Sequence, residues 1–234
     1  MGVCIEKKMK KKIFYTELAY AFGLIILAFS CAMITKASFG VSMVVAPAYI
    51  LHLKISEFLP FFSFGMAAYT FQALLLILTV IILRRAKLSY LFSFVTAVIY
   101  GFLLDGFVAL LSLVTVETLI LRMVFFAVGA IACPLGVALL FHTYIPAEAY
   151  EVFVMEISTK IGMRLHKFKT IYDCVSCVLS VVMSFCFFGW LSFNGIGWGT
   201  VICALINGPF IGLYTKWINK VFSFEDGLPL RKYF

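Results

Sequence analysis

Charge is scarce in this sequence. Only 13% of its 234 residues are Asp, Glu, Lys or Arg, whereas 64% are apolar and the mean hydropathy is +1.08. Soluble domains carry about 25% charged residues and are roughly half apolar, so the composition excludes a soluble globular protein. A disordered chain is excluded as well, because disorder requires low hydrophobicity. The composition predicts an all-α, polytopic helical membrane protein.

The sequence also lacks the motifs of membrane enzymes and ATP-driven pumps. It contains no H-E-x-x-H zinc-protease motif and no Gly-Lys-Ser/Thr phosphate loop. Asp105 follows Leu103 and Leu104 instead of the Gly-x-Gly that precedes the aspartate of intramembrane aspartyl proteases. The histidines lie at span ends or in connections, so none pairs with a serine inside a span. We therefore expect no enzymatic activity, no cofactor and no metal site.

The seven cysteines support no disulfide framework, because they are odd in number and lie mostly within apolar runs. Cys174-x-x-Cys177 matches half of a zinc or redox motif, but no second pair completes it. Packing of small side chains in the core is the favoured interpretation.

Apolar runs between charged residues predict six transmembrane helices, each near the length of about 20 residues that a bilayer requires. The first follows a basic leader, residues 1–12, but is longer than the apolar region of a signal peptide. We therefore expect it to remain as an anchor. The predicted spans are 13–35, 61–83, 89–114, 118–141, 169–191 and 198–218.

Basic residues set the orientation, because Lys and Arg concentrate in the cytoplasmic loops of membrane proteins. An arrangement with both termini in the cytoplasm, including the tail 219–234, places sixteen of the nineteen Lys and Arg residues inside. Only Lys36, Lys54 and Arg122 then lie at or near the outer surface. This topology accounts for the net charge of +8. A nucleic-acid partner is disfavoured, because the cations are scattered over short segments and no folded domain presents them.

Two further segments, 39–55 and 146–161, mix apolar residues with an interrupting proline and suit interfacial or re-entrant helices. Each follows the first span of a half, which predicts two inverted three-helix repeats, residues 13–114 and 118–218. A shift of about 103 residues sets 40–43 against 143–146. A shift of about 107 aligns Ser93, Ala97, Gly101 and Leu104 with Thr200, Ala204, Gly208 and Ile211. Inverted repeats with broken segments are typical of secondary transporters.

Several short motifs occur together in one order along the chain: Gly40-Val41-Ser42, Arg84-Arg85, Tyr100-Gly101-Phe102-Leu103-Leu104-Asp105, Gly195-Ile196-Gly197-Trp198-Gly199-Thr200 and Asn207-Gly208-Pro209. In this combination the sequence resembles the YczE/YitT group of bacterial membrane proteins. Met43 stands where that pattern has proline, and the soluble C-terminal domain of YitT is missing, which places the chain nearer the YczE branch. The resemblance implies a transporter-like role in the bacterial cytoplasmic (inner) membrane.

Polar residues inside spans are costly in hydrocarbon and often mark functional pathways. Asp105 and Arg122 lie toward the outer ends of neighbouring predicted spans, so they form either a structural salt bridge or part of a substrate or proton site. Asp173 leads a polar face that either lines a cavity or packs against another helix. Gln72 and Asn207 lie near mid-depth, where they either contact a polar ligand or bond each other across helices.

These patterns predict a secondary transporter or exporter of a small organic molecule, driven by an ion gradient if Asp105 or Asp173 exchanges protons. Its candidate site residues are Gln72, Asp105, Arg122, Asp173 and Asn207. The alternative is a non-transporting membrane component that binds a protein or lipid partner, with basic inner loops that touch anionic lipid. In both cases the lipid bilayer surrounds the chain.

Overall fold

The computed structural model describes residues 12–229 and is helical apart from one short pair of strands. The predicted basic leader, apart from Lys12, and the end of the predicted tail lie outside the described residues. The elements are β1 (Lys12–Tyr15), α1 (Thr16–Ala37), α2 (Ala46–Ile55), α3 (Phe64–Leu83), α4 (Leu88–Ser112), α5 (Leu119–Leu140), α6 (Ala149–Ile161), α7 (Leu165–Phe188), α8 (Trp198–Val221) and β2 (Phe222–Glu225).

Six of these helices, α1, α3, α4, α5, α7 and α8, are long and apolar enough to cross a membrane. They coincide with the six predicted spans, and their ends differ from the predicted ends by no more than four residues. Their outward faces carry large apolar side chains such as Ile77, Phe102 and Val178, which are more than half exposed. Such faces suit contact with lipid. The protein is therefore an integral membrane protein.

Helices α2 and α6 occupy the two segments predicted as interfacial or re-entrant. They have 10 and 13 residues, so at 1.5 Å per residue they are too short to cross about 30 Å of hydrocarbon. Each begins among buried residues and has a lysine near the surface in its last turn, Lys54 in α2 and Lys160 in α6. Both helices thus start inside the bundle and run outward.

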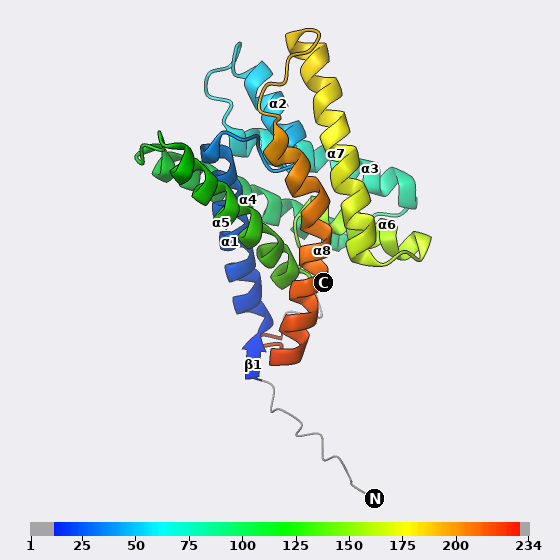
Figure 1. Cartoon of the computed structure of the whole chain (residues 1–234). Coiled ribbons are helices and arrows are strands. Elements are labelled where there is room, and N and C mark those ends of the chain that lie inside the picture. Colours follow the sequence, from blue (N-terminus) through cyan, green and yellow to red (C-terminus); the bar gives the residue numbers. More distant parts are fainter. Residues whose placement is uncertain (1–11, 230–234) are drawn as a thin grey trace, which may run out of the picture.

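Helices α1 and α5 form the antiparallel pair that joins the two halves of the chain (Figure 1). Their backbones touch through glycines: a Cβ atom on Gly136 would lie 2.9 Å from the carbonyl oxygen of Gly23. Gly129 makes a similar approach to Ser30. The small residues of α5 therefore pack against α1, as small residues do between membrane helices.

The remaining spans form two antiparallel hairpins, α3 with α4 and α7 with α8 (Figure 1). Helix α4 also packs on α1, and α8 packs on α5. A glycine lies at each hairpin crossing, Gly101 against Gly65 and Gly208 against Thr170. The short helix α2 packs on α3 and α7, while α6 packs on α7, α3 and α4.

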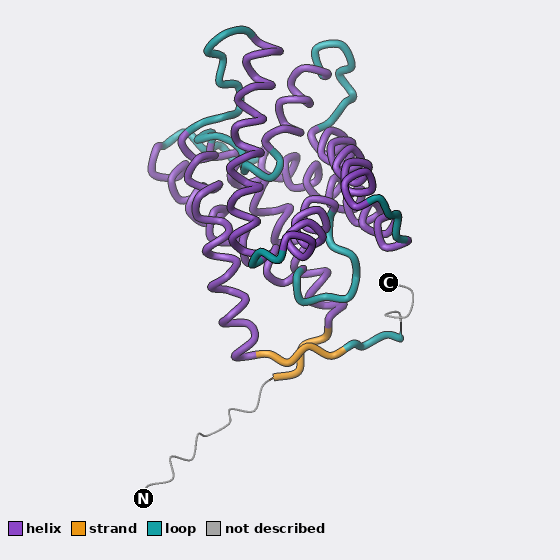
Figure 2. The backbone as a smooth tube through the Cα atoms, turned by 90° about the vertical axis from the view of Figure 1, so that its right-hand side faces the viewer, coloured by secondary structure: helices purple, strands orange, loops and turns teal. Residues whose placement is uncertain are grey.

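The two ends of the described chain meet in a short parallel pairing of β1 with β2, outside the helix bundle (Figure 2). Phe14 contacts the rings of Phe222 and Phe224, and Glu17 accepts bonds from the backbone amides of Gly227 and Leu228. The sequence does not predict this pairing, because four-residue strands beside long apolar helices leave no recognisable period.

Candidate functional site

The interior of the bundle contains a group of ionisable and amide side chains at the start of α6. Its members come from α3, α7, α8 and the beginning of α6, and each is at most 2% exposed. We call this group the central cluster: Gln72, Glu148, Glu151, Lys169, Asp173 and Asn207. Since charged groups are almost never fully buried without partners, their contacts are informative.

Lys169 is the cation of the central cluster. Its Nζ lies 3.1 Å from Oε1 of Glu151 and 3.4 Å from Oδ1 of Asp173. Lys169 and Asp173 are four residues apart on α7 and so share one helix face. Asn207 of α8 donates from Nδ2 to Oδ2 of Asp173 at 2.9 Å. These contacts connect α6, α7 and α8 through polar groups.

Gln72 of α3 connects the cluster to the N-terminus of α6. Its Nε2 donates to Oε2 of Glu148 at 2.8 Å, and its Oε1 accepts from the backbone amide of Ala149 at 2.9 Å. The first amides of a helix have no partner within the helix, so a side chain from another helix satisfies one of them here. Glu148 and Glu151 also lie at the positive end of the α6 dipole.

Several buried oxygens of this region have no hydrogen-bond partner. They include Oε1 of Glu148, Oε2 of Glu151, Oδ1 of Asn207 and the hydroxyls of Tyr150 and Tyr172. Burial raises the pKa of Glu148 well above its usual range, and the nearby carboxylate of Glu151 raises it further. Unsatisfied buried polar atoms are rare in folded proteins and require an explanation.

A narrow gap, too small to hold a water molecule, borders Asn207 and is also lined by Ser42, Met43, Cys133 and Cys203. Cys31 of α1 is buried close to Cys133. In the described part of the chain these cysteines are free, and no group of His, Cys, Asp and Glu residues could hold a metal ion. Cys174 and Cys177 are partly buried and also free.

The structure brings three of the five predicted site residues, Gln72, Asp173 and Asn207, into the central cluster. Gln72 and Asn207 bond carboxylates, Glu148 and Asp173, instead of each other. The polar face predicted for α7 is buried: Asp173, Ser176, Ser180 and Ser184 are each at most 5% exposed.

The other two predicted site residues lie elsewhere. Asp105 accepts bonds from the Ser63 hydroxyl at 2.6 Å and the Gly65 amide at 2.7 Å, at the N-terminus of α3. Arg122 donates to the carbonyls of Ala37 and Ser38, at 2.9 and 3.0 Å, at the C-terminus of α1. Each side chain satisfies orphan backbone groups of a helix end, and among the described residues no ion pair joins Asp105 to Arg122.

Sequence reasoning missed three members of the central cluster, Glu148, Glu151 and Lys169. The orientation predicted from the basic residues assigns Lys169 to a cytoplasmic loop, and the two glutamates belong to a segment between predicted spans. The spacing of Lys169 and Asp173, typical of an ion pair on one helix face, was an available signal. The burial of Glu148 and Glu151 could not be predicted from the sequence, because it depends on the tertiary packing of α6.

Two cavities open at opposite ends of the bundle. The larger has a volume of about 420 Å³ and lies where the α1–α2 connection meets the α7–α8 connection; Phe39, Tyr49, Phe193 and Trp198 contribute its aromatic lining. The smaller has a volume of about 160 Å³ and lies between the α5–α6 connection, α6 and the start of α4. We call them the outer and the inner cavity, following the orientation that the basic residues predict.

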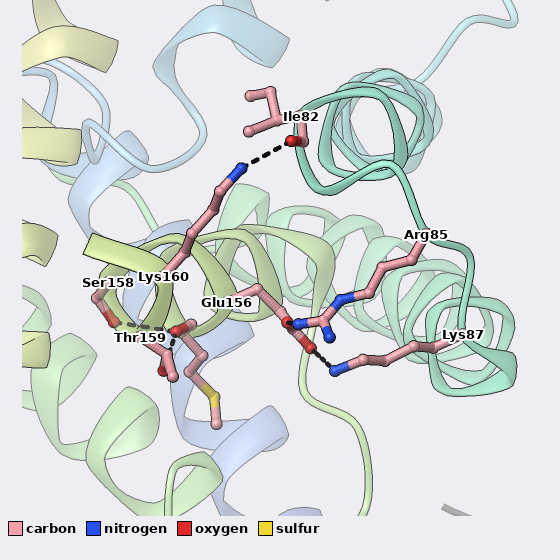
Figure 3. Close-up of polar contacts among 8 residues, drawn as sticks. Ile82, Arg85, Lys87, Glu156, Ser158, Thr159 and Lys160 are labelled. Carbon is pink, nitrogen blue, oxygen red and sulfur yellow. Dashed lines mark hydrogen bonds and ion pairs between the residues drawn. The ribbon is translucent and has the colours of Figure 1, made fainter. Parts of the chain in front are cut away.

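Ion pairs and a hydrogen bond hold the surface end of α6 beside the inner cavity (Figure 3). Glu156 lines that cavity and forms ion pairs with Lys87 and with Arg85, the latter at 3.4 Å. Lys160 donates to the carbonyl of Ile82 at 3.0 Å, at the end of α3. These contacts connect α6 to the α3–α4 turn.

Comparison with known proteins gives one match. No curated protein and no solved structure resembles the chain, so no characterised relative suggests an activity. Residues 14–216 match a family described as a family of unknown function, DUF6198. The match covers α1 to α7 completely and α8 as far as residue 216. The chain therefore belongs to the family of unknown function DUF6198.

Proposed function

We propose that this protein is a secondary transporter or exporter of a small organic molecule, which works by alternating access between two inverted repeats. The observation that carries the proposal is the central cluster at the buried start of the short helix α6. Broken helices with polar groups at their buried ends form the substrate sites of many transporters. Polar groups inside a membrane bundle are costly and typically functional.

Reciprocal hydrogen bonds support the repeat. Ser93 of α4 donates to the carbonyl of Ala147, in the segment before α6, at 2.7 Å. Thr200 of α8 donates to the carbonyl of Val41, in the segment before α2, at 2.8 Å. Each hydroxyl thus bonds the segment before the short helix of the other half. The two donors are 107 residues apart and the two acceptors 106, so this offset fits better than the offset of 103 predicted for the first segments.

The ends of the short helices follow the same offset. Lys54 of α2 lies over the ring of Phe188, the last residue of α7, at 5.6 Å. Lys160 of α6 bonds the carbonyl of Ile82 near the end of α3. Both pairs of positions are 106 residues apart. In each half the short helix therefore contacts the end of the second membrane span of the other half, α7 for α2 and α3 for α6.

The two cavities also occupy related positions. Tyr49 and Gly195 line the outer cavity, while Met155 and Ser89, each 106 residues away, line the inner one. Alternating access requires two such entrances that open in turn. The outer cavity is the wider, which fits a conformation in which the inner entrance is closed by α6.

The orientation proposed is that with both termini in the cytoplasm of a bacterium. The pairing of β1 with β2 supports it, since it holds both ends of the described chain together. The α3–α4 turn and the α6–α7 connection supply the basic inner loops. The resemblance to the YczE/YitT group supports the bacterial cytoplasmic membrane.

The test begins with a search for ligands. The purified full-length protein is screened by thermal shift against a broad panel of metabolites and antibiotics, because a ligand of the folded state raises its stability. A saturable hit is then followed as uptake into proteoliposomes. We expect Asp173→Asn to lower uptake at least about tenfold, since it removes a charge that the cluster requires. Glu117→Gln, at an exposed carboxylate of the α4–α5 connection, is the matched control.

Two results would contradict the proposal. One is a folded protein that binds no compound of the panel; the other is uptake that Asp173→Asn leaves unchanged. Either would favour the alternative function, a membrane component that binds a protein or lipid partner.

A further inference from the structure

The central cluster contains more negative than positive charge. Three carboxylates, Glu148, Glu151 and Asp173, face one ammonium, that of Lys169, and all four side chains are at most 1% exposed. Even with Glu148 neutral, two carboxylates share one cation. An uncompensated charge inside a protein costs several kcal/mol. With Glu151 and Asp173 both ionised, the cluster is one positive charge short of neutrality.

The free atoms of the cluster itself are hydrogen-bond acceptors. Oε1 of Glu148, Oε2 of Glu151 and Oδ1 of Asn207 have no partner. The orientation of the Asn207 amide is fixed because its Nδ2 donates to Asp173, so the oxygen faces away from that carboxylate. Asn207 also borders the narrow gap beside the cluster, which is too small for a ligand in this closed arrangement of the helices. Acceptors without donors indicate a ligand that brings N–H groups.

Lys169 shows that this environment accommodates an organic ammonium. Its Nζ contacts two carboxylates and lies 5.3 Å from the centre of the Tyr172 ring. Carboxylates combined with an aromatic face are the usual surroundings of bound ammonium groups. The outer cavity adds aromatic rings, and its lining contains no Lys, Arg, Asp or Glu.

We propose that the substrate of the central cluster is a small organic cation, an ammonium or amidinium, whose N–H groups donate to Glu151 and to Asn207. The proposal rests on the transporter function proposed above and names its substrate class. One positive charge neutralises the single carboxylate that Lys169 leaves in excess among Glu151 and Asp173. The cation enters from the outer cavity and reaches the cluster when the two halves separate.

The test compares three molecules of nearly equal shape and different charge. Benzamidine is a cation, benzamide is neutral and benzoate is an anion. Thermal shifts of the full-length protein in detergent are recorded with each, and putrescine, whose ammonium groups carry N–H donors, extends the set of cations. We expect saturable stabilisation by roughly 2 °C or more with a cation, and none with benzamide or benzoate.

Substitutions in the central cluster test where the cation binds. Glu151→Gln is expected to raise the half-saturating concentration of the cation about tenfold, because a charge-assisted bond is lost. Asn207→Leu should act in the same direction, and Glu117→Gln should leave binding unchanged. If Glu151→Gln fails to fold, the charge series on the natural sequence still decides the matter.

Failure of this proposal differs from failure of the proposed function. Binding of benzoate or benzamide without binding of any cation would overturn the substrate class and leave a transporter. Cation binding that Glu151→Gln and Asn207→Leu both leave unchanged would overturn the site. If no compound of the panel bound to the folded protein, the transporter function proposed above would be contradicted instead.

Discussion

Asp105 and Asp173 are both carboxylates in membrane-spanning helices, but their partners differ. Asp105 accepts bonds from Ser63 and Gly65 at the start of α3, so its role is to hold a helix end. Asp173 contacts Lys169 and Asn207 inside the bundle, so its role belongs to the central cluster. From the sequence the two were equal candidates, because both are isolated acids within apolar runs.

This difference predicts separate effects of two matched substitutions. Asp105→Asn weakens two hydrogen bonds to a helix terminus, so we expect it to destabilise the protein by about 1 to 2 kcal/mol. It should leave uptake of an identified substrate unchanged once the protein is folded. Asp173→Asn should lower uptake at least about tenfold while the protein folds normally. Thermal unfolding and uptake assays of both variants check the prediction, and equal loss of uptake in both would contradict it.

At the scale of elements, glycines decide how closely helices approach. Gly101 and Gly106 both belong to α4, yet only Gly101 faces another backbone. A Cβ atom on Gly101 would lie 2.8 Å from the carbonyl oxygen of Gly65, whereas a Cβ on Gly106 would have nothing within 4 Å. The same residue type is therefore required at one position and dispensable at the other.

Substitution by alanine should affect stability differently at these two positions. Gly101→Ala should destabilise the α3–α4 hairpin and lower the unfolding temperature, because backbone cannot move away as a flexible side chain can. Gly106→Ala should be neutral or stabilise the protein by about 0.5 to 1 kcal/mol, since alanine favours helix. Thermal unfolding in detergent measures both. A loss of stability of similar size in the two variants would show that the contact is unimportant.

The surface end of α6 offers a second prediction about an element. Glu156 pairs with Arg85 and Lys87 beside the inner cavity. Glu156→Gln removes both ion pairs, so we expect α6 to leave the α3–α4 turn more often and the inner cavity to widen. A cysteine introduced as Ser89→Cys, in the lining of that cavity, should then react faster with a membrane-impermeant maleimide in inside-out vesicles. In the same Glu156→Gln protein, a cysteine introduced as Tyr49→Cys, in the outer cavity, should react more slowly in right-side-out vesicles. The reason is that alternating access closes the outer entrance when the inner one opens.

The controls for this experiment are the same cysteines in the Glu117→Gln background and vesicles without an added cysteine. Glu57 is a further exposed acid, just after α2 at the other end of the bundle, and it forms an ion pair with Lys54 in the last turn of that helix. Glu57→Gln should not increase the reaction at Ser89→Cys. An unchanged rate at Ser89→Cys in the Glu156→Gln protein would mean that these ion pairs do not hold the inner entrance closed.

At the scale of the whole molecule, the orientation can be tested directly. The β1–β2 pairing puts the first and last described residues on one side, and the basic loops predict that this side is the cytoplasm. Fluorescent-protein fusions at both termini should fluoresce, while alkaline phosphatase inserted after residue 115 should be active. Phosphatase inserted after residue 86, in the α3–α4 turn, should be inactive. Activity at residue 86 would reverse the orientation.

The helices were predictable from the sequence to within a few residues, because hydrocarbon requires long apolar runs that are easy to recognise. The short helices could be located but not oriented. Of the predicted site residues, Gln72, Asp173 and Asn207 lie in the central cluster, whereas Asp105 and Arg122 cap helix ends. A polar residue in a span has several ways to satisfy its bonds, and the sequence does not choose among them.

The sequence by itself determined that this is a membrane protein of six spans, because the free energy of transfer into lipid depends on composition and length. The tertiary structure alone decided that Glu148 and Glu151 leave water, since their burial depends on how α6 packs against α3 and α7. It also decided that Lys169 pairs inside the bundle. Such contacts join residues distant in the chain or on different helices, and no local pattern of residues fixes them.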